Sequence, residues 1–271
     1  MSKSDSHPAA LQPSLFIPHG GGPCFFMPDP HGVWRDMEAY LRALPAHLPA
    51  RPKALLLISG HWETRGGFAF TGAAHPGLIY DYYGFPPHTY ELTYPVPGDP
   101  ALAERAAGLL RADGFAAGVD PERGLDHGVF VPMKVAFPQA DIPLVQMSLD
   151  AGLDPAAHLR AGQALAPLRE EGVLIIGSGM SFHNLRAYGD PRATAPSRAF
   201  DAWLTAAATA PAPQRAALLA RWQGAPHARF SHPREEHLLP LMVAAGASAA
   251  PGVQDFGEMV MDSAISGYSF A

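Results

Sequence analysis

Three histidines each stand at the end of a short apolar run of the kind that forms buried strands. His19 ends the run SLFIPH, His61 ends ALLLISGH and His183 ends VLIIGSGMSFH. The carboxyl ends of strands form the ligand crevice of open α/β sheets, so residues just past them can converge in space. Neutral imidazole is the commonest protein ligand for iron, zinc and copper. The spacing predicts a metal site, although any one of these histidines alone is more often a hydrogen-bonded turn or core residue.

A fourth histidine, His237, lies in a segment that the apolar spacing assigns to a helix over residues 233–246. Leu241 follows one turn later, so His237 is expected to face the core, where an imidazole needs a partner. A metal ion is one candidate for that partner. Glu236 points further round the same helix and is the alternative ligand, as the carboxylate of a two-histidine, one-carboxylate site.

A fifth histidine, His127, is followed by Gly128, which indicates a tight loop, and preceded by Asp126, a candidate to orient its ring. Taken alone, this signal is weak. Glycines flank the strand-end histidines as well, and such residues let the backbone turn sharply and leave room for a ligand. They are Gly20–Gly22, Gly60, Gly177 and Gly179.

The elements that would position these residues alternate between strands and helices. Continuous apolar runs predict buried strands at residues 13–18, 54–58, 142–149 and 173–176, and a short strand is expected at 258–262. Apolar spacing and Asp-Pro starts predict helices at about 34–48, 99–112, 154–171, 196–209, 212–222 and 233–246. Residues 71–97 are rich in Gly, Pro and Tyr and are expected to be mostly loop. This pattern predicts an α/β fold with a central, mostly parallel or mixed sheet flanked by helices, and a metal site at the carboxyl ends of its strands.

Composition supports one large domain. The chain has 271 residues, of which 48% are hydrophobic and 16% charged, which is apolar enough for a sizeable core. We expect residues 1–12 to be a disordered tail and residues 13–271 to form the domain.

Charge and cysteine content narrow the partners and the compartment. The net charge is -6 and no basic stripe stands out, so neither nucleic acid nor a membrane is an expected partner. The apolar runs are far shorter than a bilayer span of roughly 20 residues, and the polar N-terminus lacks a signal-peptide pattern. The single cysteine, Cys24, excludes an internal disulfide. A cytoplasmic location is expected, and homo-oligomerisation is left open.

Taken together, the motifs resemble those of the LigB superfamily of extradiol aromatic-ring-opening dioxygenases, in particular the branch typified by 4,5-DOPA dioxygenase. The resemblance covers nearly the whole chain after residue 12, in a fixed order. The matching segments are PHGGGPCFF, ALLLISGHWET, YDYYGFPPHTYELTYPVPGDP, GLDHGVFVPM, DIPLVQMSLD, GSGMSFHNL and EEHLLPLMVAAGA.

The resemblance implies a non-haem Fe(II) that binds a catechol and O2, held by His19, His61 and either His237 or Glu236, with His237 favoured. It implies that His183 is the acid/base and that His127 hydrogen-bonds a substrate oxygen or bound O2. His183 would become a further metal ligand if Zn occupied the site, since Zn favours four tetrahedral ligands. Aromatic-loop residues are candidates for the pocket wall, with ordinary packing as the equal alternative: Tyr82, Tyr83, Phe85 and His88.

Two other classes of function remain open. A zinc hydrolase would use the same histidines to activate water, although no HExxH motif is present. A non-catalytic metal-binding or interaction module could share the fold, because fold does not establish function. Cys24 has no clear support as a nucleophile, since a small residue packed beneath the glycine loop explains it equally well.

Overall fold

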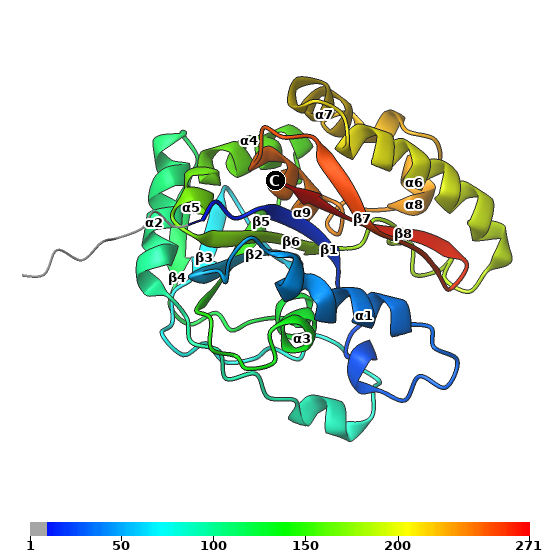
Figure 1. Ribbon diagram of the computed structural model, residues 1–271, viewed down its shortest axis with the longest axis horizontal. Coiled ribbons are helices and arrows are strands. Elements are labelled where there is room, and N and C mark those ends of the chain that lie inside the picture. Colours follow the sequence, from blue (N-terminus) through cyan, green and yellow to red (C-terminus); the bar gives the residue numbers. More distant parts are fainter. Residues whose placement is uncertain (1–9) are drawn as a thin grey trace, which may run out of the picture.

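Eight strands form one mixed sheet with the order β4-β3-β5-β2-β6-β1-β8-β7. The computed structural model describes residues 10–271 of the chain (Figure 1). The strands are β1 (Ser14–Pro18), β2 (Ala54–Thr64), β3 (Phe68–Thr71), β4 (Ala117–Asp120), β5 (Leu144–Asp150), β6 (Val173–Gly179), β7 (Gly252–Val260) and β8 (Ser263–Phe270). This confirms the predicted α/β class with a mixed central sheet.

The centre of the sheet is the parallel set β5-β2-β6-β1. Side chains alternate across each of these strands and are buried on both faces. In β1, for example, Phe16 packs into one apolar cluster, whereas Leu15 and Ile17 pack into another on the opposite face. Burial on both faces explains why these strands read as continuous apolar runs rather than alternating patterns.

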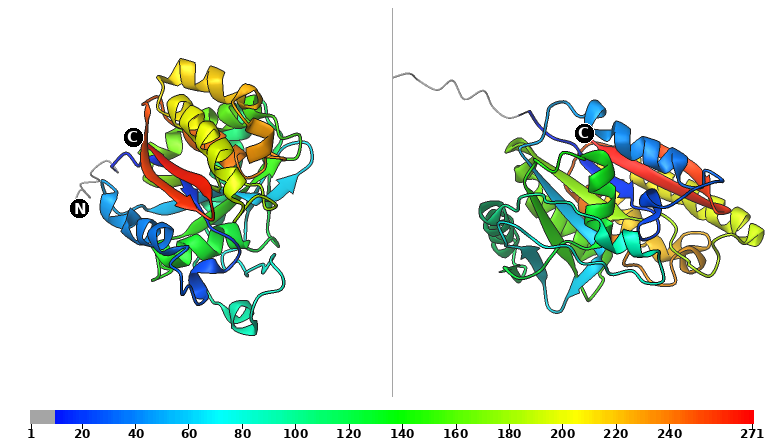
Figure 2. Two further views of the ribbon diagram at one scale, coloured as in Figure 1. Left: turned by 90° about the vertical axis from the view of Figure 1, so that its right-hand side faces the viewer. Right: turned by 90° about the horizontal axis from the view of Figure 1, so that it is seen from below.

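Helices cover both faces of the sheet (Figures 1 and 2). On one face lie α2 (Pro100–Ala112), α4 (Pro155–Leu165), α5 (Pro167–Glu170), α6 (Thr194–Ala208), α7 (Ala212–Leu219), α8 (Ala228–Ser231) and α9 (Leu239–Gly246). On the other face lie α1 (Arg35–Ala43) and α3 (His127–Ala136), together with the long loop that follows β3. Short 3-10 helices span Cys24–Phe26, Leu44–His47, Pro87–Glu91, Pro191–Ala193 and Trp222–Gly224.

Two helix starts match the Asp-Pro signals. Asp99 accepts a hydrogen bond from the backbone N–H of Leu102 at the start of α2, and Asp154 accepts one from Ala156 at the start of α4. The second of the two predicted helices is divided, because Pro167 begins the separate short helix α5. The Asp N-cap and the proline in the first turn therefore predicted where these two helices begin, but not where the second one ends.

The predicted helix over residues 233–246 is wrong in its first half. Residues 233–238 form bends and turns, and α9 begins only at Leu239. Pro240 favours the later start, because proline lacks a backbone N–H and is best accommodated in the first turn of a helix. In a helix begun at residue 233, Pro240 would lie in the interior. His237 consequently lies in a turn and not on a helix face.

Three further predictions are corrected. The single strand expected at 258–262 is the hairpin β7–β8, whose turn residues Met261 and Asp262 both have positive φ, as a type I′ hairpin turn requires. His127 does not lie in a loop but is the first residue of α3. The helix expected to reach residue 222 ends at Leu219.

Most of the expected tail, residues 1–9, lies outside the described residues. Gln12 is buried, and its backbone N–H donates to the Arg169 carbonyl. Among residues 10–271, no helix is both long and apolar enough to span a bilayer.

Candidate metal centre

Five histidines meet at the carboxyl ends of the central strands. His19 directly follows β1, and His183 is the fourth residue after β6. His61 lies inside β2, at the irregularity where the register with β5 shifts between Ile58 and Glu63. This break in the strand lets His61 turn towards the others. His127 from the start of α3 and His237 from the turn before α9 complete the group.

The Nε2 atoms of three of these histidines face one another. His61 Nε2 lies 3.3 Å from His19 Nε2 and 3.1 Å from His237 Nε2. The ring centres of His19 and His237 are 5.2 Å apart. His19 and His237 are buried, and His61 is partly buried. The sequence prediction that these side chains converge agrees with this geometry.

The opposite ring nitrogens, Nδ1, are held by acceptors. His19 Nδ1 lies 3.0 Å from Ser178 Oγ, whose own hydroxyl donates to the Gly128 carbonyl. Ser178 therefore accepts from His19, which leaves the proton on Nδ1. His237 Nδ1 lies 2.9 Å from Glu236 Oε1. A hydrogen-bonded Nδ1 turns the Nε2 lone pair towards the centre, as in most metal-binding histidines.

Burial keeps these imidazoles neutral. It lowers the pKa of His19 and of His61 well below the usual 6.5, and lowers that of His237 to about 4. Neutral Nε2 atoms with protonated Nδ1 atoms point lone pairs at each other, and these repel unless a cation lies between them. Ligands bound at about 2.0–2.2 Å to one first-row ion lie roughly 3.0–3.4 Å apart. The donor set and its spacing therefore fit a metal ion.

Glu236 binds two histidines from their Nδ1 side. Its Oε1 lies 2.9 Å from His237 Nδ1 and 3.2 Å from His183 Nδ1. The rings of His183 and His237 stack with centres 3.4 Å apart. Burial alone would raise the pKa of Glu236, but hydrogen bonds from these histidines outweigh it and lower the pKa. Glu236 is thus an ionised carboxylate that orients both rings.

Asp81 likewise faces the Nδ1 atoms of two histidines, on the other side of the centre. Its Oδ1 lies 2.7 Å from His127 Nδ1, and its Oδ2 lies 3.5 Å from His61 Nδ1. The donor atoms form two groups with metal-binding spacing and no residue in common, namely His19 with His61 and His127, and His183 with Glu236 and His237.

Three glycines let the chain before α9 lie directly against the sheet. A side chain at Gly60 would press on the Glu236 carbonyl, one at Gly179 would overlap the His237 carbonyl oxygen, and one at Gly177 would overlap that of Pro240. These glycines therefore make room for backbone rather than for a ligand, which corrects the expectation. Gly20 and Gly22 do have positive φ and turn the chain sharply after β1.

A cavity of about 650 Å³ opens onto the histidines. Of the four aromatic-loop candidates, Tyr82, Tyr83 and Phe85 line it, together with Trp34 and Cys24. His88 does not line it, and its Nε2 lies 3.1 Å from the Phe26 carbonyl instead. Burial raises the pKa of the Cys24 thiol to about 12, so a reactive thiolate has no support.

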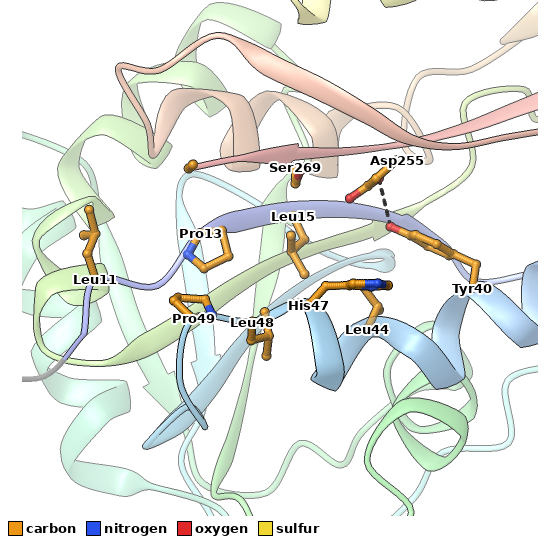
Figure 3. Close-up of a pocket in the computed structure, with 11 residues that line it drawn as sticks. Leu11, Pro13, Leu15, Tyr40, Leu44, His47, Leu48, Pro49, Asp255 and Ser269 are labelled. Carbon is orange, nitrogen blue, oxygen red and sulfur yellow. Dashed lines mark hydrogen bonds between the residues drawn. The ribbon is translucent and has the colours of Figure 1, made fainter.

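A second hollow of about 640 Å³ lies elsewhere, between the end of α1, the start of β1 and the β7–β8 hairpin (Figure 3). There the Tyr40 hydroxyl lies 3.2 Å from Asp255 Oδ1. None of the five clustered histidines lines this hollow. The cavity beside the five histidines is therefore the candidate active site.

Sequence reasoning missed Asp81 and Ser178, and it misplaced the role of Asp126. Asp126 is buried and accepts hydrogen bonds from Ser59 Oγ (2.8 Å) and from Gln146, while Asp81 binds the His127 ring. Asp81 stands in the aromatic loop DYYGFPPH, where nothing in the spacing distinguishes an acceptor from a surface residue. Ser178 lies in the Gly-Ser-Gly that ends β6, and its place next to a strand end was the one available signal.

Comparisons with known proteins identify the family. Residues 14–266 match the family model for the catalytic LigB subunit of aromatic ring-opening dioxygenase. The chain is 44% identical over 256 residues to the dioxygenase tasH of Hapsidospora irregularis, covering 88% of this chain and 78% of that one. It is 38% identical to a 4,5-DOPA dioxygenase extradiol of Beta vulgaris (88% and 87% covered) and 36% identical to that of Escherichia coli (87% and 84%).

The fold is shared with a solved structure as well. An uncharacterized protein of Escherichia coli K12 superposes with a TM-score of 0.76 at 28% identity, covering 96% of this chain and all of that one. None of these comparisons favours a zinc hydrolase or a non-catalytic module. The chain belongs to the LigB family of aromatic ring-opening dioxygenases, and it is an extradiol ring-cleavage dioxygenase.

Proposed function

We propose that the protein opens the ring of a catechol with O2, using Fe(II) held by His19, His61 and His237. The observation that carries the proposal is the meeting of three Nε2 atoms at 3.3 and 3.1 Å, each on a ring whose Nδ1 faces an oxygen acceptor. An ion held by three protein ligands would keep further positions open for substrate and O2. The names of the relatives support the same reaction class.

His237 rather than Glu236 is the proposed third ligand. Glu236 Oε1 faces the Nδ1 atoms of His237 and His183, on the side of these rings away from the other Nε2 atoms. A carboxylate in that position raises the basicity of its histidine and fixes the ring, which is the usual role of an outer carboxylate at a metal site. His237 lies in a turn, so its direction is not set by a helix face.

The bound ion would supply the redox chemistry and the anchor for the two catechol oxygens. His183 lines the cavity, and Glu236 accepts from its Nδ1, so its Nε2 is available to take the catechol proton and return it to the cleaved product. His127 is held in the same way by Asp81 and would hydrogen-bond a substrate oxygen or O2. Cleavage beside the diol then gives a ring-opened semialdehyde.

Zn would bind the same histidines, with His183 as the fourth ligand, and give an inactive form because Zn has no redox chemistry. A cytoplasmic location and homo-oligomerisation stay predictions. One partial relative, 29% identical over 134 residues, is named as the beta subunit of 2-aminophenol 1,6-dioxygenase, which gives assembly with further subunits some support.

The test is to load the protein anaerobically with Fe(II), measure metal per chain, and then add O2 and a panel of catechols. We expect about one metal per chain, O2 uptake and a yellow product. His61→Ala should lose the metal, whereas His47→Ala, an exposed histidine beside the other hollow, should keep it. Full Fe(II) occupancy without O2 uptake on any catechol would overturn the proposed reaction, and retention of metal by His61→Ala would overturn the ligand set.

A further inference from the structure

The cavity over the histidines has an uncharged lining. Apart from the five histidines, the described residues that line it are glycines, Cys24, and Met, Leu and aromatic side chains. No Lys, Arg, Asp or Glu of residues 10–271 is among them. Its volume of about 650 Å³ lies within the range of roughly 300–1,000 Å³ that larger organic ligands fill, and exceeds what a bare catechol ring needs.

Three charged groups near the cavity already bind other side chains, and a fourth does not line it. Asp81 and Glu236 bind the histidines from behind. Arg234 pairs with Glu63 at 2.5 Å. Arg186 is exposed and does not belong to the lining. A carboxylate or ammonium on the substrate would thus lose its hydration in the cavity without gaining a charged partner.

Exposed apolar side chains gather at the rim of this cavity. Tyr83 is 91% exposed, Leu185 72% and Met261 42%, and all three line the cavity. They come from three separate segments: the loop after β3, the loop after β6 and the turn of the β7–β8 hairpin. Exposed apolar groups that converge on a hollow are typical of a ligand-binding groove.

Resting on the proposed function, we propose that the substrate is a catechol carrying an uncharged, apolar substituent that extends from the histidines to the rim formed by Tyr83, Leu185 and Met261. The ring binds at the metal end, and the substituent replaces water along the Gly20–Gly22 loop and the aromatic wall. Catechols with an amino-acid or carboxylate side chain are poor substrates, because the cavity offers no opposite charge.

A matched series of catechols tests this preference. The three compounds are 4-propylcatechol, 3-(3,4-dihydroxyphenyl)propanoate and L-DOPA, which share the ring and a three-carbon chain and differ in charge. Affinity is measured by anaerobic titration of the metal-loaded protein, and kcat/KM by O2 uptake. We expect 4-propylcatechol to exceed both charged compounds by at least about tenfold in each measurement. Equal or better binding of the propanoate or of L-DOPA overturns the proposal.

Because affinity is measured separately from turnover, failure of this proposal can be distinguished from failure of the proposed function. If no catechol is turned over but 4-propylcatechol still binds best, the reaction is wrong and the apolar site stands. Turnover of all three compounds at similar kcat/KM leaves the reaction in place and overturns the substrate class.

Variants at the rim give an independent test. Leu185→Arg and Met261→Arg each place a cation beside the cavity at an exposed position, where folding should tolerate it. Each should shift the kcat/KM ratio towards the propanoate by roughly tenfold. Leu11→Arg is the control, because Leu11 is 52% exposed and lies at the other hollow. The rim assignment is wrong if the control shifts the ratio as much as the rim variants, or if neither rim variant shifts it.

Discussion

Asp81 holds His127 by both its ring and its backbone. Asp81 Oδ1 accepts from His127 Nδ1 at 2.7 Å and from the His127 backbone N–H at 3.0 Å. Burial would raise the pKa of Asp81, but the hydrogen bonds from His127 outweigh it, and the pKa is lowered. Since the other carboxylate oxygen lies 3.5 Å from His61 Nδ1, one ionised group orients a proposed metal ligand and a proposed substrate-binding histidine together.

Asp81→Asn tests that role. An amide offers only one acceptor oxygen and no charge, so it cannot hold both rings as the carboxylate does. We expect metal affinity or kcat to fall by roughly 10–100-fold, as is usual when an outer carboxylate at a metal site is lost. The KM for the catechol should change less than kcat. Asp113→Asn, which removes an exposed partner of Arg160, is the matched control and should behave as the wild type.

The sequence could locate the ligand histidines but not the residues that orient them. His19 and His61 were found because an apolar strand precedes each one, and parallel strands bring their carboxyl ends to one edge. Asp81 lies in a loop without periodicity, and it contacts a residue 46 positions later in the chain. Local spacing carries no information about such a contact.

The error at His237 has a local cause. Apolar spacing after residue 233 resembles a helix, but Pro240 favours a helix that begins at Leu239. His237 still points to the centre, for a different reason. Gly60, Gly177 and Gly179 let the turn before α9 pack against β2 and β6. The sequence pattern thus singled out His237, whereas the packing that positions it could be seen only in the structure.

Gly179→Ala should displace His237 by pushing on its backbone carbonyl. The added methyl group would overlap the His237 carbonyl oxygen, so the turn that carries His237 must move away from β6. We expect a loss of about 1–3 kcal/mol in the free energy of unfolding and weaker metal binding. Gly118→Ala is the control, because a Cβ there meets nothing within 4 Å. Equal metal affinity in the two variants would contradict this account of how His237 is placed.

His183→Ala should separate acid/base work from metal binding. In the Fe(II) form His183 is proposed to move protons and not to hold the metal, so turnover should fall about 10²–10⁴-fold. Metal content should change little. Measuring both on the same preparation decides the role, since a joint loss of metal and activity would make His183 a ligand. Arg186→Ala, three residues later in the same loop, controls for general disturbance of that segment.

Metal removal should lower the stability of the protein and abolish its activity. The Nε2 atoms of His19, His61 and His237 are brought together with their lone pairs facing one another, so the ion offsets repulsion in the folded state. At a free metal concentration of 100 times Kd, binding adds about 2.7 kcal/mol to the free energy of unfolding. Chelation should therefore lower the melting temperature, and either Fe(II) or Zn should restore it, while only Fe(II) restores O2 uptake. Identical melting temperatures with and without metal would contradict a centre built by these residues.

His232 should make stability depend on pH below neutrality. The ring is buried against Phe200 and Trp222, and its Nε2 lies 2.9 Å from the Ser181 carbonyl, just before His183. Burial lowers the pKa of His232 from 6.5 to about 3. The folded protein therefore keeps this ring neutral at pH values where the unfolded chain protonates it, and stability is lost as the pH falls from about 6.5 towards 3.

His232→Gln isolates this effect, because glutamine can still donate a hydrogen bond but does not titrate. At pH 7.5 the variant should be less stable than the wild type, since it loses the packing against the aromatic rings. Between pH 7.5 and 5.0 the wild type should lose about 2 kcal/mol that the variant does not lose, so the difference between them narrows. Urea unfolding of both metal-free proteins at three pH values measures this. A difference that stays constant with pH would show that the His232 ring titrates equally in the folded and unfolded states.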